Sequence, residues 1–218
     1  MLSRLLTKPS SLSREAWSNK GAVLCDDLGN YDDAIKVFDK AIELKPDYAE
    51  AWSNKGVTLS NLGKHDGAVK AFDKAIELEP DYAEAWSNKG VTLSILGNCD
   101  DAIKAYDKAI ELEPDYAEVW YNKGITLSDL GKYDDAIKAY DKAMELKPDF
   151  AEAWYSKGEA LSEQDKKEEA IQAFSKAIEI DPFHGQAWAA KSHALENLGR
   201  TTEADAAFAK AKELGYTG

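Results

Sequence analysis

The 218-residue chain contains little cysteine, little histidine and no long apolar run. Its two cysteines, Cys25 and Cys99, have neither disulfide-framework nor zinc-site spacing, which predicts free thiols in a reducing compartment. Its three histidines, His65, His184 and His193, are scattered and have no ligand-like neighbour in the sequence. No stretch approaches the roughly 18 apolar residues that cross a membrane. We therefore expect no metal, no cofactor, no membrane partner and a cytoplasmic location.

Basic residues are also scarce relative to acidic ones. The chain has 27 Lys and Arg against 40 Asp and Glu, a formal net charge of −13. Such a charge repels a phosphate backbone, and no Lys/Arg stripe is concentrated enough to overcome the repulsion. Nucleic acid is therefore excluded as a predicted partner.

The abundant feature is a repeat. Residues 49–82 and 83–116 differ at only six of 34 positions, so they are copies of one unit. Tryptophan marks six such units, with a gap of 34 residues everywhere except the first gap of 35: Trp17, Trp52, Trp86, Trp120, Trp154 and Trp188. Gly, Ala, an aromatic residue and Pro recur with the same period. A period of this length predicts a stacked array of small units.

Each unit is predicted to form two amphipathic helices, because its apolar residues recur at spacings of three and four. An Asp and a Glu three residues later, such as Asp47 and Glu50, resemble a capping box at the start of each first helix. Leu-Gly pairs such as Leu62 and Gly63 predict a left-handed stop at its end. A Pro that closes most units prevents the second helix from continuing.

A 34-residue unit with Trp, Gly, Leu, Ala, aromatic, Ala and Pro in this order resembles the tetratricopeptide repeat (TPR). The resemblance covers residues 14–218. It implies an all-α, right-handed superhelix (an α-solenoid) of six helix-turn-helix repeats, with the first helices lining a concave groove. It also implies a role in binding other proteins.

These patterns give the predicted domain organisation. Residues 1–13 form a leader or partial cap, and 14–218 form a single TPR domain with repeats 14–48, 49–82, 83–116, 117–150, 151–184 and 185–218. The extra residue in the first repeat predicts an irregularity near Asp26 and Asp27. In the fifth repeat Gln164 and Asp165 replace Leu-Gly, so the turn is expected to change its form.

The Trp-bearing face of each first helix is expected to pack against the second helix. A core Trp replaced by Ala, as in Trp86→Ala, would then cost about 3 to 5 kcal/mol. The same face carries a Lys in every unit: Lys20, Lys55, Lys89, Lys123, Lys157 and Lys191. We expect its stem to lie on apolar surface and its ammonium to reach acidic side chains of the same unit.

The opposite face of the first helices is the predicted groove. It carries an Asn column for main-chain contacts with a peptide, an exposed apolar column, two tyrosines and acidic residues that favour a basic ligand. The predicted peptide-binding residues are Asn19, Asn54, Asn88, Asn122, Val57, Val91, Ile125, Tyr121, Tyr155, Glu84 and Glu118. In the alternative interpretation the Asn residues bond neighbouring helices, the Glu residues stabilise helix starts and the apolar column has no ligand.

No nucleophile, base or metal-ligand constellation is present in the sequence, and identical units repeat the same polar residues without convergence on a pocket. The sequence therefore predicts a non-enzymatic adaptor or scaffold that binds a peptide segment of a partner protein. The alternative is a structural array without a peptide ligand, whose near-identical units stack end to end into homo-oligomers.

Overall fold

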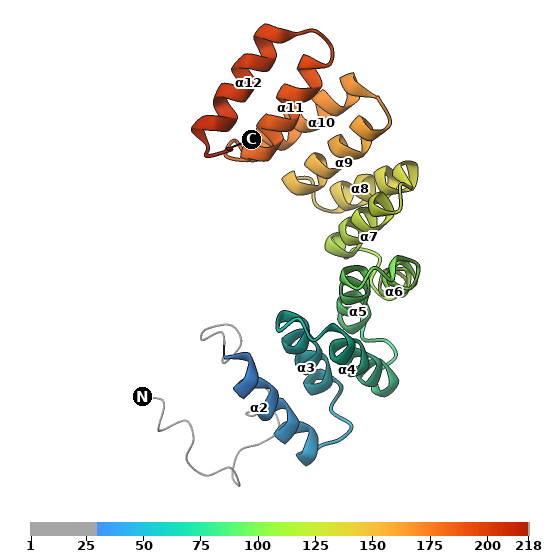
Figure 1. Ribbon diagram of the computed structural model, residues 1–218. Coiled ribbons are helices and arrows are strands. Elements are labelled where there is room, and N and C mark those ends of the chain that lie inside the picture. Colours follow the sequence, from blue (N-terminus) through green and yellow to red (C-terminus); the bar gives the residue numbers. More distant parts are fainter. Residues whose placement is uncertain (1–29, 218) are drawn as a thin grey trace. The chain divides into compact units, whose positions relative to one another are not determined.

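The computed structural model describes residues 30–217, and every helix or strand that it assigns there is an α-helix (Figure 1). The chain divides into two compact units, residues 1–112 and 113–218. The first unit contains α2 (Tyr31–Leu44), α3 (Ala49–Asn61), α4 (His65–Leu78), α5 (Ala83–Ile95) and α6 (Cys99–Leu112). The second contains α7 (Ala117–Asp129), α8 (Tyr133–Leu146), α9 (Ala151–Glu163), α10 (Lys167–Ile180), α11 (Gly185–Glu196) and α12 (Thr201–Glu213). The predicted all-α fold is confirmed.

The helices pair as the repeat predicts. Within a repeat, the first helix packs against the second, as in α3 with α4 and α9 with α10. Within each unit, a second helix also packs against the next first helix, as in α2 with α3 and α10 with α11. The leader 1–13, Asn19 and the irregularity expected near Asp26 and Asp27 lie outside the described residues.

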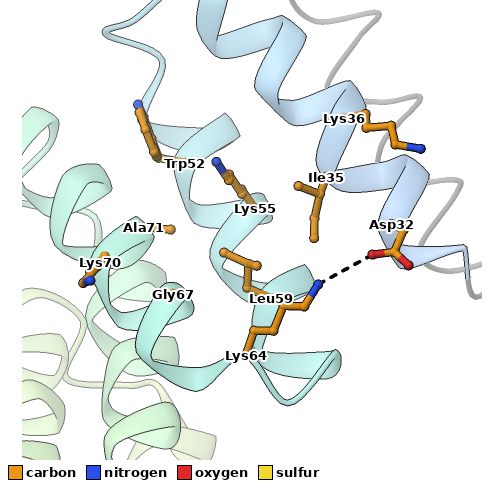
Figure 2. Close-up of a pocket in the computed structure, with 10 residues that line it drawn as sticks. All are labelled: Asp32, Ile35, Lys36, Trp52, Lys55, Leu59, Lys64, Gly67, Lys70 and Ala71. Carbon is orange, nitrogen blue, oxygen red and sulfur yellow. Dashed lines mark ion pairs between the residues drawn. The ribbon is translucent and has the colours of Figure 1, made fainter.

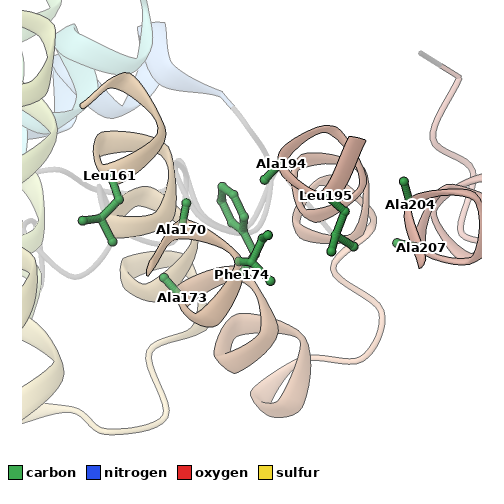
Figure 3. Packing of buried hydrophobic residues seen from close by; sticks show 9 residues of the cluster. Leu161, Ala170, Ala173, Phe174, Ala194, Leu195, Ala204 and Ala207 are labelled. Carbon is green, nitrogen blue, oxygen red and sulfur yellow. The ribbon is translucent and has the colours of Figure 1, made fainter. Parts of the chain in front are cut away.

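The core is built around the aromatic residue of the second helices α2, α4, α6, α8 and α10. Phe38, Phe72, Tyr106, Tyr140 and Phe174 are each 1% exposed. Figure 3 shows one such ring, Phe174 of α10, among small residues and leucines of α9, α10 and α11, including Leu161, Ala170, Ala194 and Leu195. Large rings against alanines let adjacent helices approach closely and exclude water.

The tryptophans are not fully buried, which corrects their prediction as core residues. Each of the five described tryptophans is only half-buried. Four of them donate an Nε1 hydrogen bond to the Pro carbonyl of the preceding loop: Trp52 to Pro46, Trp86 to Pro80, Trp120 to Pro114 and Trp188 to Pro182, at 3.0 to 3.2 Å. The indole is amphipathic, so its apolar part packs at the edge of the core while its N–H holds the preceding loop by a hydrogen bond.

The helix starts differ from the predicted capping boxes. The first helices begin at Ala49, Ala83, Ala117 and Ala151, one residue later than an Asp cap would require. The cap residue is Tyr48, Tyr82, Tyr116 or Phe150, and none of these forms a side-chain cap hydrogen bond. The capping-box prediction is wrong because the Asp lies in the loop.

The turns between paired helices keep one form. Gly63, Gly97 and Gly131 have φ values of 72°, 77° and 70°, which confirms the left-handed stop. Asp165 takes the same place in the fifth repeat with φ 59°. Its N–H donates to the Ser162 carbonyl at 2.9 Å, as the Gly63 N–H does to Ser60. The expected change of turn is therefore wrong, because Asp tolerates this conformation better than most residues.

The recurring lysine joins consecutive repeats. Lys55 Nζ lies 2.6 Å from Asp39 Oδ1, and the same distance separates Lys89 from Asp73 and Lys157 from Asp141. Each Asp belongs to the second helix of the preceding repeat, so the predicted same-unit partner is wrong. The ammonium of Lys55 also lies 5.3 Å from the ring centroid of Trp52, a cation–π distance.

Candidate peptide-binding surface

In the first unit, the predicted residues lie on α3 and α5, which contact each other. Ser60 Oγ on α3 lies 3.4 Å from Thr92 Oγ1 on α5, so the two faces are continuous. Val57 and Val91 are half-buried. The apolar column was predicted to be exposed, and the structure shows its valines partly covered by their neighbours.

The backbone carbonyls and the side-chain amides of the Asn column differ in their hydrogen bonding. The carbonyls of Asn54, Asn88 and Asn122 accept hydrogen bonds of 2.8 to 3.1 Å from the Thr four residues later, a short step along the same helix. In the part of the chain that the structure describes, no hydrogen bond reaches the half-buried side-chain amides of Asn88 and Asn122. Each amide retains two donors and an acceptor for a ligand.

In the second unit, the groove face has two hollows. The larger, of about 520 Å³, lies among α7, α8 and α9. Its wall combines the apolar Ile125 and the tyrosines Tyr133 and Tyr140 with acidic residues that include Asp129 and Glu159. The hollow therefore offers both apolar contact and negative charge.

The second hollow, of about 310 Å³, lies among α9, α10 and α11. Tyr155 and Glu159 of α9, His193 of α11 and Tyr216 after α12 line it. Glu159 thus faces both hollows. This exposed carboxylate accepts a hydrogen bond from the Tyr155 hydroxyl. It forms no ion pair with another described residue, so it can still pair with a ligand cation.

Sequence reasoning missed Glu159 and His193. They occupy the position of Val57, Val91 and Ile125 in the fifth and sixth repeats. The sequence did contain a signal for them. The apolar residue of this repeated position is replaced by a polar one in the last two repeats, and such a replacement indicates that these repeats have a different surface chemistry. Two residues predicted from the sequence share a hollow with Glu159. Ile125 lines the larger hollow with it, and Tyr155 lines the smaller one.

The two predicted tyrosines are fixed by other rings. Tyr121 lies 4.8 Å from Phe150 and 6.0 Å from Tyr140, measured between ring centroids. Tyr155 lies 5.0 Å from the His184 ring, and burial, followed by the nearby negative charge of Glu159, raises the pKa of its hydroxyl. Rings held in this way present a rigid surface at low entropic cost to binding.

The predicted acidic residues differ in their pairing. Glu84 is exposed, whereas Glu118 Oε1 lies 3.1 Å from Lys147 Nζ. A hydrogen bond from its own backbone N–H, followed by the bond from Lys147, lowers the pKa of Glu118. Both partners are about half exposed, so a ligand cation can compete with Lys147 for this carboxylate.

Tyr140 is expected to make the stability of the protein fall at alkaline pH. Burial raises the pKa of its hydroxyl to about 12, although the Ser128 hydroxyl lies within 3.2 Å. Because this pKa exceeds the unfolded value, the contribution of Tyr140 to stability is full below pH 10 and falls as pH rises through 12. Between pH 8 and 11 the chain should lose about 1.4 kcal/mol more than a Tyr140→Phe variant, measured by urea unfolding. Equal losses in both proteins would contradict this role.

No metal site or membrane span is found in residues 30–217. No group of three His, Cys, Asp or Glu side chains in this range is arranged to hold a metal ion. Within the same range, no helix has the length and apolar character needed to cross a bilayer.

Family comparisons match the repeat. Tetratricopeptide repeat models match residues 49–82, 81–149, 121–185 and 185–214, and a TPR repeat model matches 26–63. No curated protein sequence matches the chain.

Solved structures agree. A crystal structure of MamA is 30% identical over 73% of this chain and 93% of that chain, with a TM-score of 0.69. YrrB, described as a TPR protein with an unusual peptide-binding site, is 25% identical over 82% of this chain and 92% of that chain, with a TM-score of 0.67. The PilF protein of Pseudomonas aeruginosa shares the fold, with a TM-score of 0.81 at 18% identity over 94% and 93% of the two chains. With its repeat period, its helix pairing and these matches, the chain belongs to the tetratricopeptide repeat family.

Proposed function

We propose that this protein is a non-enzymatic, cytoplasmic adaptor in which residues 14–218 act as a single TPR domain that binds a peptide segment of a partner protein in its groove. The observation that carries the proposal is the pair of hollows around Glu159, each with tyrosine in its wall. A pocket of this kind suits a segment that combines Lys or Arg with aliphatic or aromatic side chains. The peptide-binding site named for YrrB supports a peptide as the ligand of this chain.

The predicted residues have defined parts in this proposal. The side-chain amides of Asn54, Asn88 and Asn122 bond the peptide main chain, as Asn19 does if its helix follows the pattern. Val57, Val91, Ile125, Tyr121 and Tyr155 contact peptide side chains. Glu84 and Glu118 extend the negative surface to which Glu159 contributes most.

The test uses a library of short peptides with one Lys or Arg at each position, bound to the full chain and measured by fluorescence anisotropy. The tightest peptides should carry a basic residue near an aromatic one, and Glu159→Lys should weaken them about tenfold or more by reversing the charge of the pocket. Glu179→Lys is the matched control. It makes the same charge change at an exposed site on α10, outside both hollows. An equal loss in both variants would show nonspecific attraction and refute the groove as the site.

A second variant tests the Asn column. Replacing both Asn88 and Asn122 by Ala should weaken the same peptides by about 1 to 3 kcal/mol with little change in stability. Equal thermal damage and unchanged affinity would assign the column a structural role. Light scattering over a range of concentrations addresses end-to-end self-assembly, because only that alternative makes the mass rise with concentration without a peptide.

A further inference from the structure

A cleft separate from the groove lies in the first unit. It has a volume of about 710 Å³ and is formed by α2, α3 and α4 (Figure 2). Its apolar wall includes Ile35, Trp52 and Leu59, from α2 and α3. None of the groove residues predicted from the sequence lines it.

Lysines line the rim of this cleft, in a protein whose net charge is −13. Three of them pair with carboxylates: Lys36 with Asp33, Lys55 with Asp39 and Lys64 with Asp32. Four lysines and one aspartate, Asp32, line it: Lys36, Lys55, Lys64 and Lys70. Lys64 Nζ lies 3.6 Å from Asp32 Oδ1, the ion pair drawn in Figure 2. Both of these side chains are more than half exposed, so the pair is weak and can exchange for a ligand carboxylate.

Lys70 differs from the lysines at its position in other repeats. Lys36, Lys104 and Lys138 each pair with an Asp three residues earlier, at 2.7 to 2.8 Å. In this repeat the earlier residue is Gly67, and Lys70 has no ion pair within residues 30–217. One ammonium on the cleft is therefore left without a carboxylate partner.

Gly67 also opens the apolar wall. Leu59 is half-buried, whereas Leu93, Leu127, Leu161 and Leu195 at the same position are at most 7% exposed. A Cβ added at Gly67 would lie 3.5 Å from Leu59 Cδ1, so the missing side chain leaves part of this leucine uncovered. An uncovered leucine beside an unpaired lysine is a place for a ligand with both apolar and anionic groups.

We propose that this cleft binds an acidic peptide segment of a partner protein. An aliphatic or aromatic side chain of the segment packs on Leu59, Ile35 and Trp52, and a carboxylate pairs with Lys70. This partner has the opposite charge to the basic segment proposed for the groove, so the two sites do not compete for one ligand. The chain would then hold two segments of different chemistry at once.

The test uses a short fluorescent peptide of alternating Glu and Leu, with an uncharged peptide of alternating Gln and Leu as its control. The full chain should bind the acidic peptide in anisotropy measurements, and the double variant Gly67→Asp, Lys70→Gln should weaken it about tenfold. The double variant should fold at least as well as the parent chain. An Asp in the first turn of α4 is favourable there and replaces a helical glycine.

Two control variants separate this site from the rest of the surface. Lys104→Gln removes the equivalent lysine of the next repeat, and Glu159→Gln removes one carboxylate from the groove. Both should leave the affinity for the acidic peptide within about twofold. No measurable binding to the parent chain, or equal loss with Lys104→Gln, would overturn the proposal. Failure of the acidic peptide would leave the basic-peptide result for the groove intact, since the two tests share no ligand.

Discussion

Replacing Phe174 by Ala should destabilise the protein by about 3 to 5 kcal/mol, because it removes a ring that is 1% exposed. The ring packs among residues of α9, α10, α11 and α12, including Leu161, Leu195 and Ala207 (Figure 3). These residues enclose the ring, so Ala would leave a cavity whose cost adds to the lost burial. Urea unfolding followed by circular dichroism should show the midpoint fall accordingly.

Phe183 provides the control on the same chain. It is 79% exposed in the loop between α10 and α11, and Phe183→Ala makes the same chemical change. Its effect should stay within about 0.5 kcal/mol. A comparable loss from both variants would mean that burial does not decide the contribution of these rings to stability.

The sequence predicted the repeat, the all-α fold and the helix pairing, because spacings of three and four within a 34-residue period are typical of stacked helix pairs. It did not predict helix starts as well. An Asp followed by a Glu, as in Asp47 and Glu50, fits a capping box in sequence, but the loop to Ala49 places the aspartate outside the helix.

The sequence spacing also did not predict which contacts form between repeats. The spacing places Lys55 on the face toward the second helices but does not distinguish the helix of its own repeat from that of the preceding one. The pairing with Asp39 follows from how repeats stack, which is a tertiary property. The same limit applied to the groove. The sequence predicted the apolar column of Val57, Val91 and Ile125 as part of the binding surface. It did not predict Glu159, which occupies the same position in the fifth repeat and lines both hollows.

The second large effect on stability is expected at Gly56, where an aromatic ring packs too closely to leave room for a side chain. A Cβ at Gly56 would lie 2.7 to 2.9 Å from three ring atoms of Phe72, which is itself 1% exposed. The buried ring has no free space to move into, so Gly56→Ala should destabilise the protein by about 1 to 3 kcal/mol despite the better helix propensity of Ala. Shrinking the ring with Phe72→Leu in the same chain should recover part of this loss, because the two changes share one contact.

Gly67, in the second helix of the same repeat, should respond in the opposite direction. Its added Cβ meets only Leu59, at 3.5 Å, an ordinary contact distance. Gly67→Ala should therefore stabilise the protein by about 0.5 to 1 kcal/mol, since only the unfolded-state entropy and helix propensity change. Urea unfolding of the two single variants gives the comparison. If both glycine changes were stabilising, the close approach of Phe72 to α3 would be no constraint, and the glycine at this position of each repeat would need another explanation.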